Sequence, residues 1–304
     1  ENRFWLGPEG GKFSLFVKPG SSMVFANWKT PAPFDSEPWK VIDKTSQSVT
    51  MQKNMELINY RGTNLNIGVK RSIQILSNSE ISQKIGLDLD ASVKAVGYQT
   101  DNIITNDGKT AWTEATGVPC IWMLDMFNPS PATVIVVPFK NLSGKPFDKV
   151  VTSDYFGQIP PDRLKHNDDM LFLKADGKSR GKLGVAPDFA KTVVGSYDPQ
   201  HKVLTILMFD LDSSAKYLNQ EWNTTKPVFA GDAVNAYNDG PLADGTQMGP
   251  FYEMESVSPA AFLKPGESLA HKHAVFHFTG DEKGLDAIAQ KVLGVSLEAI
   301  QKEF

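Results

Sequence analysis

The chain has 304 residues, of which 41% are hydrophobic and 22% charged, an ordinary composition for a globular protein. Its 31 Lys and Arg against 35 Asp and Glu give a formal net charge of −4, which argues against a nucleic-acid partner. The longest apolar runs, such as 133–139, are far shorter than the roughly 20 residues of a membrane helix, so we expect no transmembrane segment.

A single cysteine, Cys120, excludes an intramolecular disulfide and a cysteine-based zinc site. It stands in an apolar run, which predicts a small buried side chain. The first five residues read as the middle of a strand, and the chain begins without Met. We therefore expect that a leader has been removed, and leave open whether strands of the domain are missing as well.

Strand patterns dominate the chain. Residues 12–17 are short, apolar and aromatic, and 66–76 alternate with Arg71 among the isoleucines of one face, the mark of a strand with one wet face. The other predicted strands are 87–96, 121–126, 133–138, 170–174, 193–197, 203–209, 249–257 and 268–279. The one convincing helix covers 283–304, interrupted at Gly294 and restarted at Ser296.

This pattern predicts an all-β fold, one large antiparallel sandwich with a short C-terminal helix. No linker, repeat or βαβ alternation divides the chain, so we expect a single domain over 1–304. The sequence Lys264-Pro265-Gly266-Glu267 predicts a type II turn. We expect this turn to pair 249–263 with 268–279 as antiparallel neighbours.

Two carboxylates are the first candidates for chemistry. Glu253 and Glu255 stand two apart on a predicted strand, so both side chains should point to the same face. Like charges this close raise the proton affinity of one group, as general acid–base chemistry requires. The alternative is a solvated strand face.

Three histidines share a face of the last strand: His271, His273 and His277. Alternate histidines can bind a metal if a carboxylate faces them. In a straight hairpin, however, Glu255 would lie about 16 Å from His271, at roughly 3.3 Å per residue. Only a kink at Ser258-Pro259 would bring them together, so ordinary hydrogen-bonded histidines are the better interpretation.

Three segments carry the polar and aromatic side chains that sugar sites use: 2–5, 217–222 and 232–239. Pyranose rings pack on Trp or Tyr, while Asn, Gln, Asp and Arg bind the hydroxyl groups. The segment 232–239 could be a calcium loop or capped turns, and capped turns are the better interpretation. The candidate sugar-binding residues are Arg3, Trp5, Arg71, Asn219, Gln220 and Trp222.

The segments 250–255 and 262–267 resemble the closing pattern of the galactose mutarotase-like superfamily, the aldose 1-epimerases and their relatives: a strand glutamate, a Leu-x-Pro-Gly-Glu turn and a last strand. Segment 204–222 resembles the preceding part of that family. The resemblance implies a β-supersandwich fold. Segments 2–11, 154–161 and 235–250 more closely resemble an uncharacterised branch of secreted Bacteroidetes proteins, which implies an extracytoplasmic location.

In the epimerases, a glutamate takes a proton from the anomeric hydroxyl and a histidine protonates the ring oxygen. By resemblance the glutamate is Glu253 or Glu255, and the counterpart of the histidine segment is Asn106-Asp107, with no histidine before position 166. Two functions stay open: an epimerase or other sugar-processing enzyme, or a non-catalytic glycan-binding protein. We expect a mono- or oligosaccharide partner, and no metal or cofactor.

Overall fold

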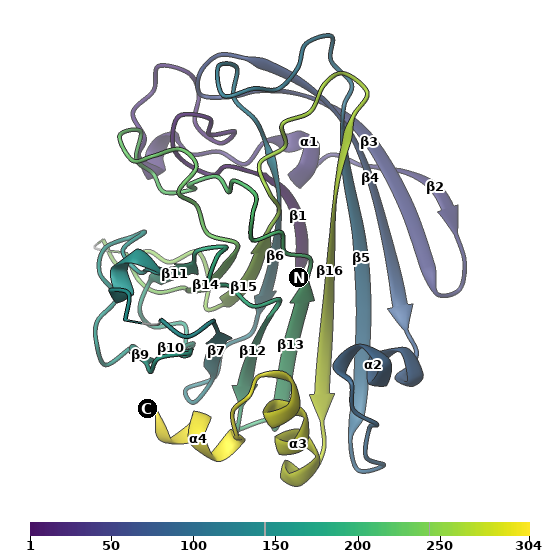
Figure 1. Cartoon of the computed structure of the whole chain (residues 1–304), viewed down its shortest axis with the longest axis vertical. Coiled ribbons are helices and arrows are strands. Elements are labelled where there is room, and N and C mark those ends of the chain that lie inside the picture. The colour runs from purple at the N-terminus through teal and green to yellow at the C-terminus, as the bar shows by residue number, and fades with distance from the viewer. Residues whose placement is uncertain (143, 243) are drawn as a thin grey trace.

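A computed structural model describes residues 1–142, 144–242 and 244–304, and it consists mainly of two antiparallel sheets (Figure 1). The six-stranded sheet runs, in spatial order, β1 (Asn2–Gly7), β6 (Cys120–Phe127), β15 (Tyr252–Val257), β14 (Val234–Asn238), β11 (Gly181–Val185) and β8 (Val151–Thr152). Two large antiparallel sheets are what the all-β prediction requires, so the predicted fold class is confirmed.

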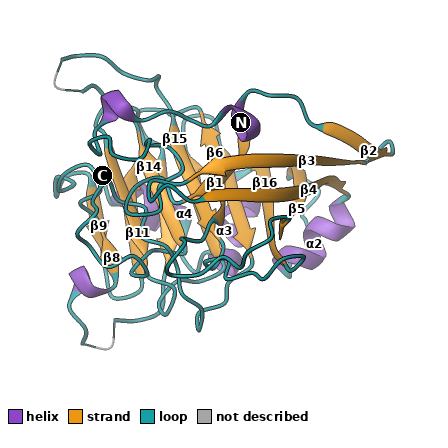
Figure 2. Cartoon of the chain, turned by 90° about the horizontal axis from the view of Figure 1, so that it is seen from above, coloured by secondary structure: helices purple, strands orange, loops and turns teal. Residues whose placement is uncertain are grey.

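The second sheet has ten strands. Their spatial order is β2 (Lys40–Lys44), β3 (Ser48–Ile58), β4 (Asn64–Leu76), β5 (Lys94–Asn106), β16 (Ser268–Thr279), β13 (Val203–Phe209), β12 (Val193–Asp198), β7 (Val134–Pro138), β10 (Met170–Lys174) and β9 (Leu164–His166). Seen from above, β2, β3 and β4 extend to one side of the molecule, away from β8, β9 and β11 (Figure 2).

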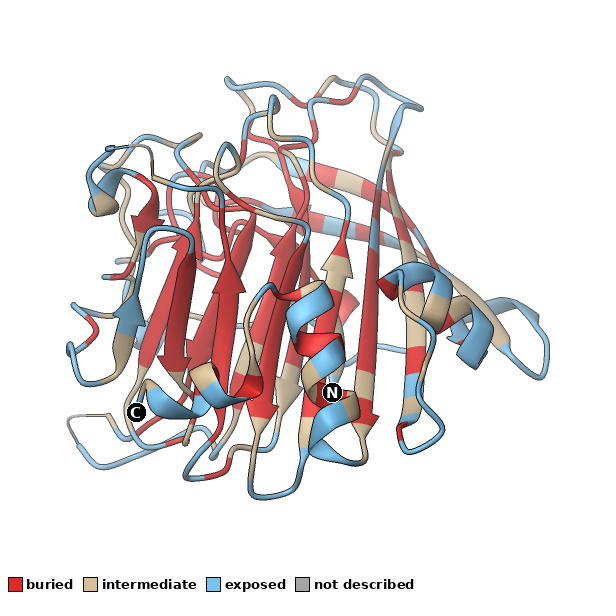
Figure 3. Cartoon of the chain, turned by 60° about the horizontal axis from the view of Figure 1, so that its bottom comes forward, coloured by how far each residue is buried: buried red, intermediate tan, exposed pale blue. Residues whose placement is uncertain are grey.

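Buried apolar side chains lie on both faces of the larger sheet. Its inner face packs on the six-stranded sheet, where Ile67, Ile104 and Val275 meet Leu6, Ile121 and Met254 in one cluster. Its outer face carries Ile206, Phe276 and Phe278, which the helices α2 (Asn78–Ile85), α3 (Glu282–Val292) and α4 (Leu297–Lys302) cover. Figure 3 shows the C-terminal helices lying across strands that are mostly buried.

The C-terminal helix forms as predicted, in two pieces. Gly294 has a φ of +80° between α3 and α4, and the Ser296 side chain accepts a hydrogen bond from the Ala299 amide at 3.1 Å. The sequence prediction missed α2, although the pair Ser77 and Glu80 forms a capping box. The remaining helical turns are α1 (Ala32–Asp35), Phe25–Asn27 and Phe147–Lys149. None of the described helices is long and apolar enough to span a membrane.

Most predicted strands are present, with two exceptions. Residues 12–17 form a loop with one bridge, Val17 to Trp28, and the predicted strand 87–96 is a loop up to the start of β5 at Lys94. The apolar residues of 12–17 are buried all the same, so their pattern reported burial rather than pairing. Cys120 is buried, as expected. The single domain over residues 1–304 stays a prediction.

The predicted turn at Lys264 forms, but the predicted strand pair is wrong. Gly266 has a φ of +81° and the Glu267 amide donates to the Lys264 carbonyl at 3.0 Å, as a type II turn requires. The two strands nevertheless belong to different sheets, because β15 pairs with β14 and β6 while β16 pairs with β5 and β13. After Ser258-Pro259 the chain leaves one sheet and crosses to the other.

The docking of α3 gives a stability test. Replacing the fully buried Leu285 by Ala should lower the free energy of unfolding by about 2–5 kcal/mol, because it removes apolar contacts and leaves a cavity. The exposed Lys283→Ala on the same helix should change it by less than about 0.5 kcal/mol. Urea unfolding measures both, and equal effects would contradict the packing described here.

Candidate active site

The alternation of β15 separates a core face from a cavity face. Ser256 lies between the sheets, where its hydroxyl is 2.8 Å from ring nitrogens of both His271 and His273. Glu253 and Glu255 therefore share the opposite face, as the strand spacing predicts. On that face the six-stranded sheet and the loops above it enclose a cavity of about 250 Å³.

The floor of the cavity is a row of residues that pair across four neighbouring strands. Lys182 pairs with Tyr237, Tyr237 with Glu253, and Glu253 with Met126. Among the described residues, the lining comprises Arg3, Trp5, Glu9, Phe25, Trp28, Thr30, Trp122, Leu124, Met126, Phe156, Arg180, Lys182, Trp222, Tyr237, Met248, Phe251 and Glu253.

Aromatic rings form much of the wall. Phe25 stacks on Trp222 with centroids 6.0 Å apart and on Trp28 at 6.1 Å, with interplanar angles of 10° and 16°. The Phe156 ring meets Trp222 edge-on at 6.0 Å. Trp5 meets Trp122 edge-on at 5.4 Å. Such flat apolar faces, next to charged groups, suit a ligand that has both C–H faces and hydroxyl groups.

A buried ion pair joins the floor residue Lys182 to Glu255. Glu255 is completely buried, and its Oε2 accepts hydrogen bonds from Lys182 Nζ at 2.9 Å and from Trp122 Nε1 at 2.7 Å. Burial opposes the charge of Lys182, but Glu255, Glu9 and Glu253 outweigh it and raise the pKa of the lysine above its usual value. Lys182 is therefore a cation held by carboxylates.

Glu253 and Glu9 line the cavity above this pair. Burial raises the pKa of Glu253 well above its usual value, and the neighbouring charge of Glu255 raises it further. Burial also raises the pKa of Glu9, although Lys182 acts in the opposite direction. When all carboxyl groups are ionised, the second oxygen of Glu255, Oε1, receives no hydrogen bond from the described residues. A protonated Glu253 would supply the missing donor.

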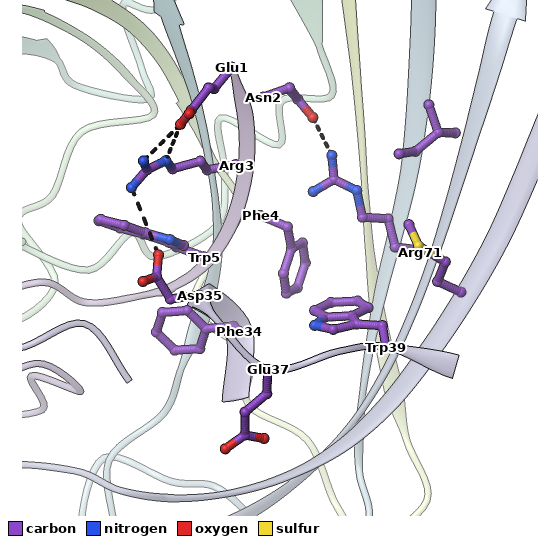
Figure 4. A pocket seen from close by; sticks show the side chains of 12 residues that line it. Glu1, Asn2, Arg3, Phe4, Trp5, Phe34, Asp35, Glu37, Trp39 and Arg71 are labelled. Atoms are coloured by element: carbon purple, nitrogen blue, oxygen red, sulfur yellow. Dashed lines mark hydrogen bonds and ion pairs between the residues drawn. The ribbon is translucent and has the colours of Figure 1, made fainter. Parts of the chain in front are cut away.

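The predicted sugar-binding residues divide between two hollows. Arg3, Trp5 and Trp222 line the cavity with Glu253. Arg71 lies in a second, wider hollow of about 720 Å³, beside Trp39, and donates to the Asn2 side chain (Figure 4). Arg3 and Trp5 line both hollows, and Arg3 contacts Glu1 at 2.7 Å and Asp35 at 3.8 Å there.

The other candidates do not line the Glu253 cavity. Asn219 accepts a hydrogen bond from the Glu221 amide, and the buried Gln220 accepts one from the Glu9 amide at 3.2 Å, so both hold loops that form the wall. Asn106 holds a turn by donating to Thr110 and Leu263 carbonyls, and Asp107 beside it is exposed. Within 232–239, residues 234–238 form β14 rather than a loop, and Tyr237 alone lines the cavity.

His271 and His273 belong to the core between the sheets. His273 bonds Asp125 through Nε2 and Ser256 through Nδ1, all three buried. Burial and the neighbouring His273 lower the pKa of His271 to about 3. The described residues contain no cluster of three or more His, Cys, Asp or Glu able to hold a metal ion.

Glu9, Arg180, Lys182 and Trp122 are cavity residues that the sequence reasoning missed. They come from three segments far apart in the chain, around residues 9, 122 and 180–182, which only folding brings together. Glu9 offered a weak signal, an acid set between Pro8 and Gly10. No local pattern distinguishes Lys182 from an exposed strand lysine.

Comparison with known proteins gives a family and similar solved structures. Residues 1–304 match the model of a protein family described as a family of unknown function (DUF6786). No curated protein sequence matches the chain. A provisionally assigned aldose 1-epimerase of Escherichia coli K12 is similar in structure, at 11% identity and a TM-score of 0.53, over 90% of this chain and 83% of that one.

Two further solved structures extend the similarity. The Slr1438 protein of Synechocystis sp. PCC 6803 has 10% identity and a TM-score of 0.51, over 91% of this chain and 78% of that one. A galactose mutarotase-like protein of Lactobacillus casei ATCC 334 has 12% identity and a TM-score of 0.46, over 91% and 84%. The Escherichia coli and Synechocystis structures, whose TM-scores exceed 0.5, show that the chain has the galactose mutarotase-like fold that the sequence resemblance predicts.

The buried ion pair gives a second test. Lys182→Met should lower the free energy of unfolding by about 3–5 kcal/mol at pH 7, because it leaves the Glu255 carboxylate buried without its cation. The double variant Lys182→Met with Glu255→Gln should recover part of that loss. If the double variant unfolds as easily as the single one in urea, the loss arises from lysine packing and not from an uncompensated charge.

Proposed function

Because the chain belongs to the DUF6786 family of proteins of unknown function and has the galactose mutarotase-like fold, we propose its function from its cavity: it binds a sugar and exchanges protons with it through Glu253. The observation that carries this proposal is the meeting of Glu253 and Glu9 with the rings of Trp5, Trp122 and Trp222 in one cavity. The rings would stack on the sugar and the charged groups would bind its hydroxyls.

The two cavity carboxyls would supply both halves of an anomer exchange. One, protonated, gives a proton to the ring oxygen as the C1–O5 bond breaks; the other, ionised, takes the proton of the anomeric hydroxyl as the C1=O bond forms. Reclosure on the other face of C1 returns both protons. Glu253, whose pKa is raised the more strongly, is the donor in ring opening, and Glu9 is the acceptor.

With Glu253 as the proton donor, the mechanism needs no histidine in the cavity. All five histidines of this chain lie outside the cavity lining. Asp107, which by resemblance takes the place of the epimerases' histidine, is exposed and does not line the cavity either. The same observation favours the second candidate function, a glycan-binding protein without catalysis. An extracytoplasmic location and a Bacteroidetes origin stay predictions from the resemblance.

Glu253→Gln should slow anomer exchange by about 10²–10⁴-fold, because glutamine keeps the shape of the side chain but cannot transfer a proton. Polarimetry, or exchange NMR of the α and β signals, measures the rate. Activity of the unaltered protein should fall as pH rises through the pKa of Glu253, since the donor is then ionised. The exposed Glu56→Gln is the control and should keep full activity.

The outcome separates the two candidate functions. Wild-type protein that binds sugars without speeding anomer exchange is a binding protein. If Glu253→Gln exchanged anomers at the rate of the unaltered protein, Glu253 would have no part in the mechanism.

Trp222→Ala should weaken sugar binding at least tenfold by calorimetry, since it removes a ring that stacks with Phe25 and Trp28 on the cavity wall. Trp39→Ala, in the neighbouring hollow, is a matched loss of an indole and should leave the affinity within about twofold. A loss of affinity in Trp39→Ala with none in Trp222→Ala would place the sugar in the hollow of Figure 4 and not in the Glu253 cavity.

A further inference from the structure

Arg180 is a cavity residue with an unusual environment. It directly precedes β11, and its guanidinium carbon lies 3.8 Å from the ring centroid of Phe156 and 5.9 Å from that of Phe25. Its Nε donates to the Tyr237 hydroxyl at 3.3 Å. All three rings line the cavity. The guanidinium is therefore held by aromatic rings and one phenol.

The other cavity cations have acidic partners and Arg180 has none. Arg3 is paired with Glu1 and Asp35, and Lys182 with Glu255. No carboxylate lies within 4.0 Å of Arg180 among the described residues, and the two positions outside them, Ser143 and Ala243, carry no charge.

Neither cavity acid forms an ion pair with Arg180. Burial raises the pKa of Glu253 well above its usual value, which favours its neutral form. Glu9, the proposed proton acceptor, interacts more strongly with the charge of Lys182 than with that of Arg180. A partly buried arginine without a carboxylate partner presents its N–H donors in a planar fork, which fits an oxyanion with two equivalent oxygens.

We propose that Arg180 binds an anionic group carried by the sugar, so that the ligand of the cavity is an acidic saccharide, with a carboxylate or phosphate outside the ring, rather than a neutral hexose. This inference rests on the proposed sugar-binding function and adds the substrate class to it. Uronates and hexose 6-phosphates share the required oxyanion on C6.

Calorimetry at low salt tests the proposal with five probes: D-glucose, D-galactose, D-glucuronate, D-galacturonate and D-glucose 6-phosphate. At least one acidic probe should bind at least tenfold more tightly than its neutral counterpart, and added salt should reduce that preference. Comparing the affinities of the two uronates with that of D-glucose 6-phosphate shows whether the cavity binds a carboxylate or a phosphate.

Variants connect the preference to one side chain. Arg180→Gln should bring the acidic and neutral probes to within about threefold of each other, while Arg180→Lys should keep part of the preference because it keeps the charge without the fork. Arg163→Gln, which removes an arginine paired with Asp176, is the control and should keep the whole preference. Circular dichroism confirms that each variant is folded.

The outcomes distinguish this inference from the proposed function. Neutral sugars that bind as tightly as acidic ones, or a preference that survives in Arg180→Gln, overturn the role of Arg180 and leave sugar binding standing. If none of the five probes binds, both the inference and the proposed function fail.

Discussion

The cavity depends on one buried interaction, the ion pair between Lys182 and Glu255. Removing a carboxylate and an ammonium group from water is costly, and the pair offsets this cost only when both are held by further hydrogen bonds. Trp122 supplies one of these, and three neighbouring strands fix the positions. Lys182 is thereby held against Glu255 in an ion pair, whereas it acts on Glu9 and Glu253 without forming an ion pair with either among the described residues.

The protonation states above the pair follow from that constraint. With Lys182 committed to Glu255, Glu253 lies beside a negative charge in a poorly solvated cavity, which favours its protonated form. A carboxyl that holds its proton can donate it, a role that the epimerases give to histidine. Because a protonated Glu253 carries no negative charge, it does not compensate the charge of Arg180, and the cavity would suit an anionic sugar.

Local sequence patterns predicted part of this site. Period-two alternation placed Glu253 and Glu255 on one face, and the aromatic segments containing Trp5 and Trp222 indicated a wall for a sugar ring. The predicted pairing of β15 with β16 was wrong. A turn specifies local geometry, whereas the sheet that each strand joins depends on distant partners. Lys182 and Arg180 could not be identified for the same reason, since their importance arises from residues brought close only by folding.

The protonation of Glu253 is the most direct test of this account. A carbon-13 NMR titration of its carboxyl, assigned by comparison with Glu253→Gln, reports the state of that one group. The account expects the signal to stay in the protonated form well above the ordinary carboxyl pKa of 4.5. Titration at or below that value would show an ionised Glu253 at neutral pH, and would contradict both the proton-donor role and the uncompensated charge of Arg180.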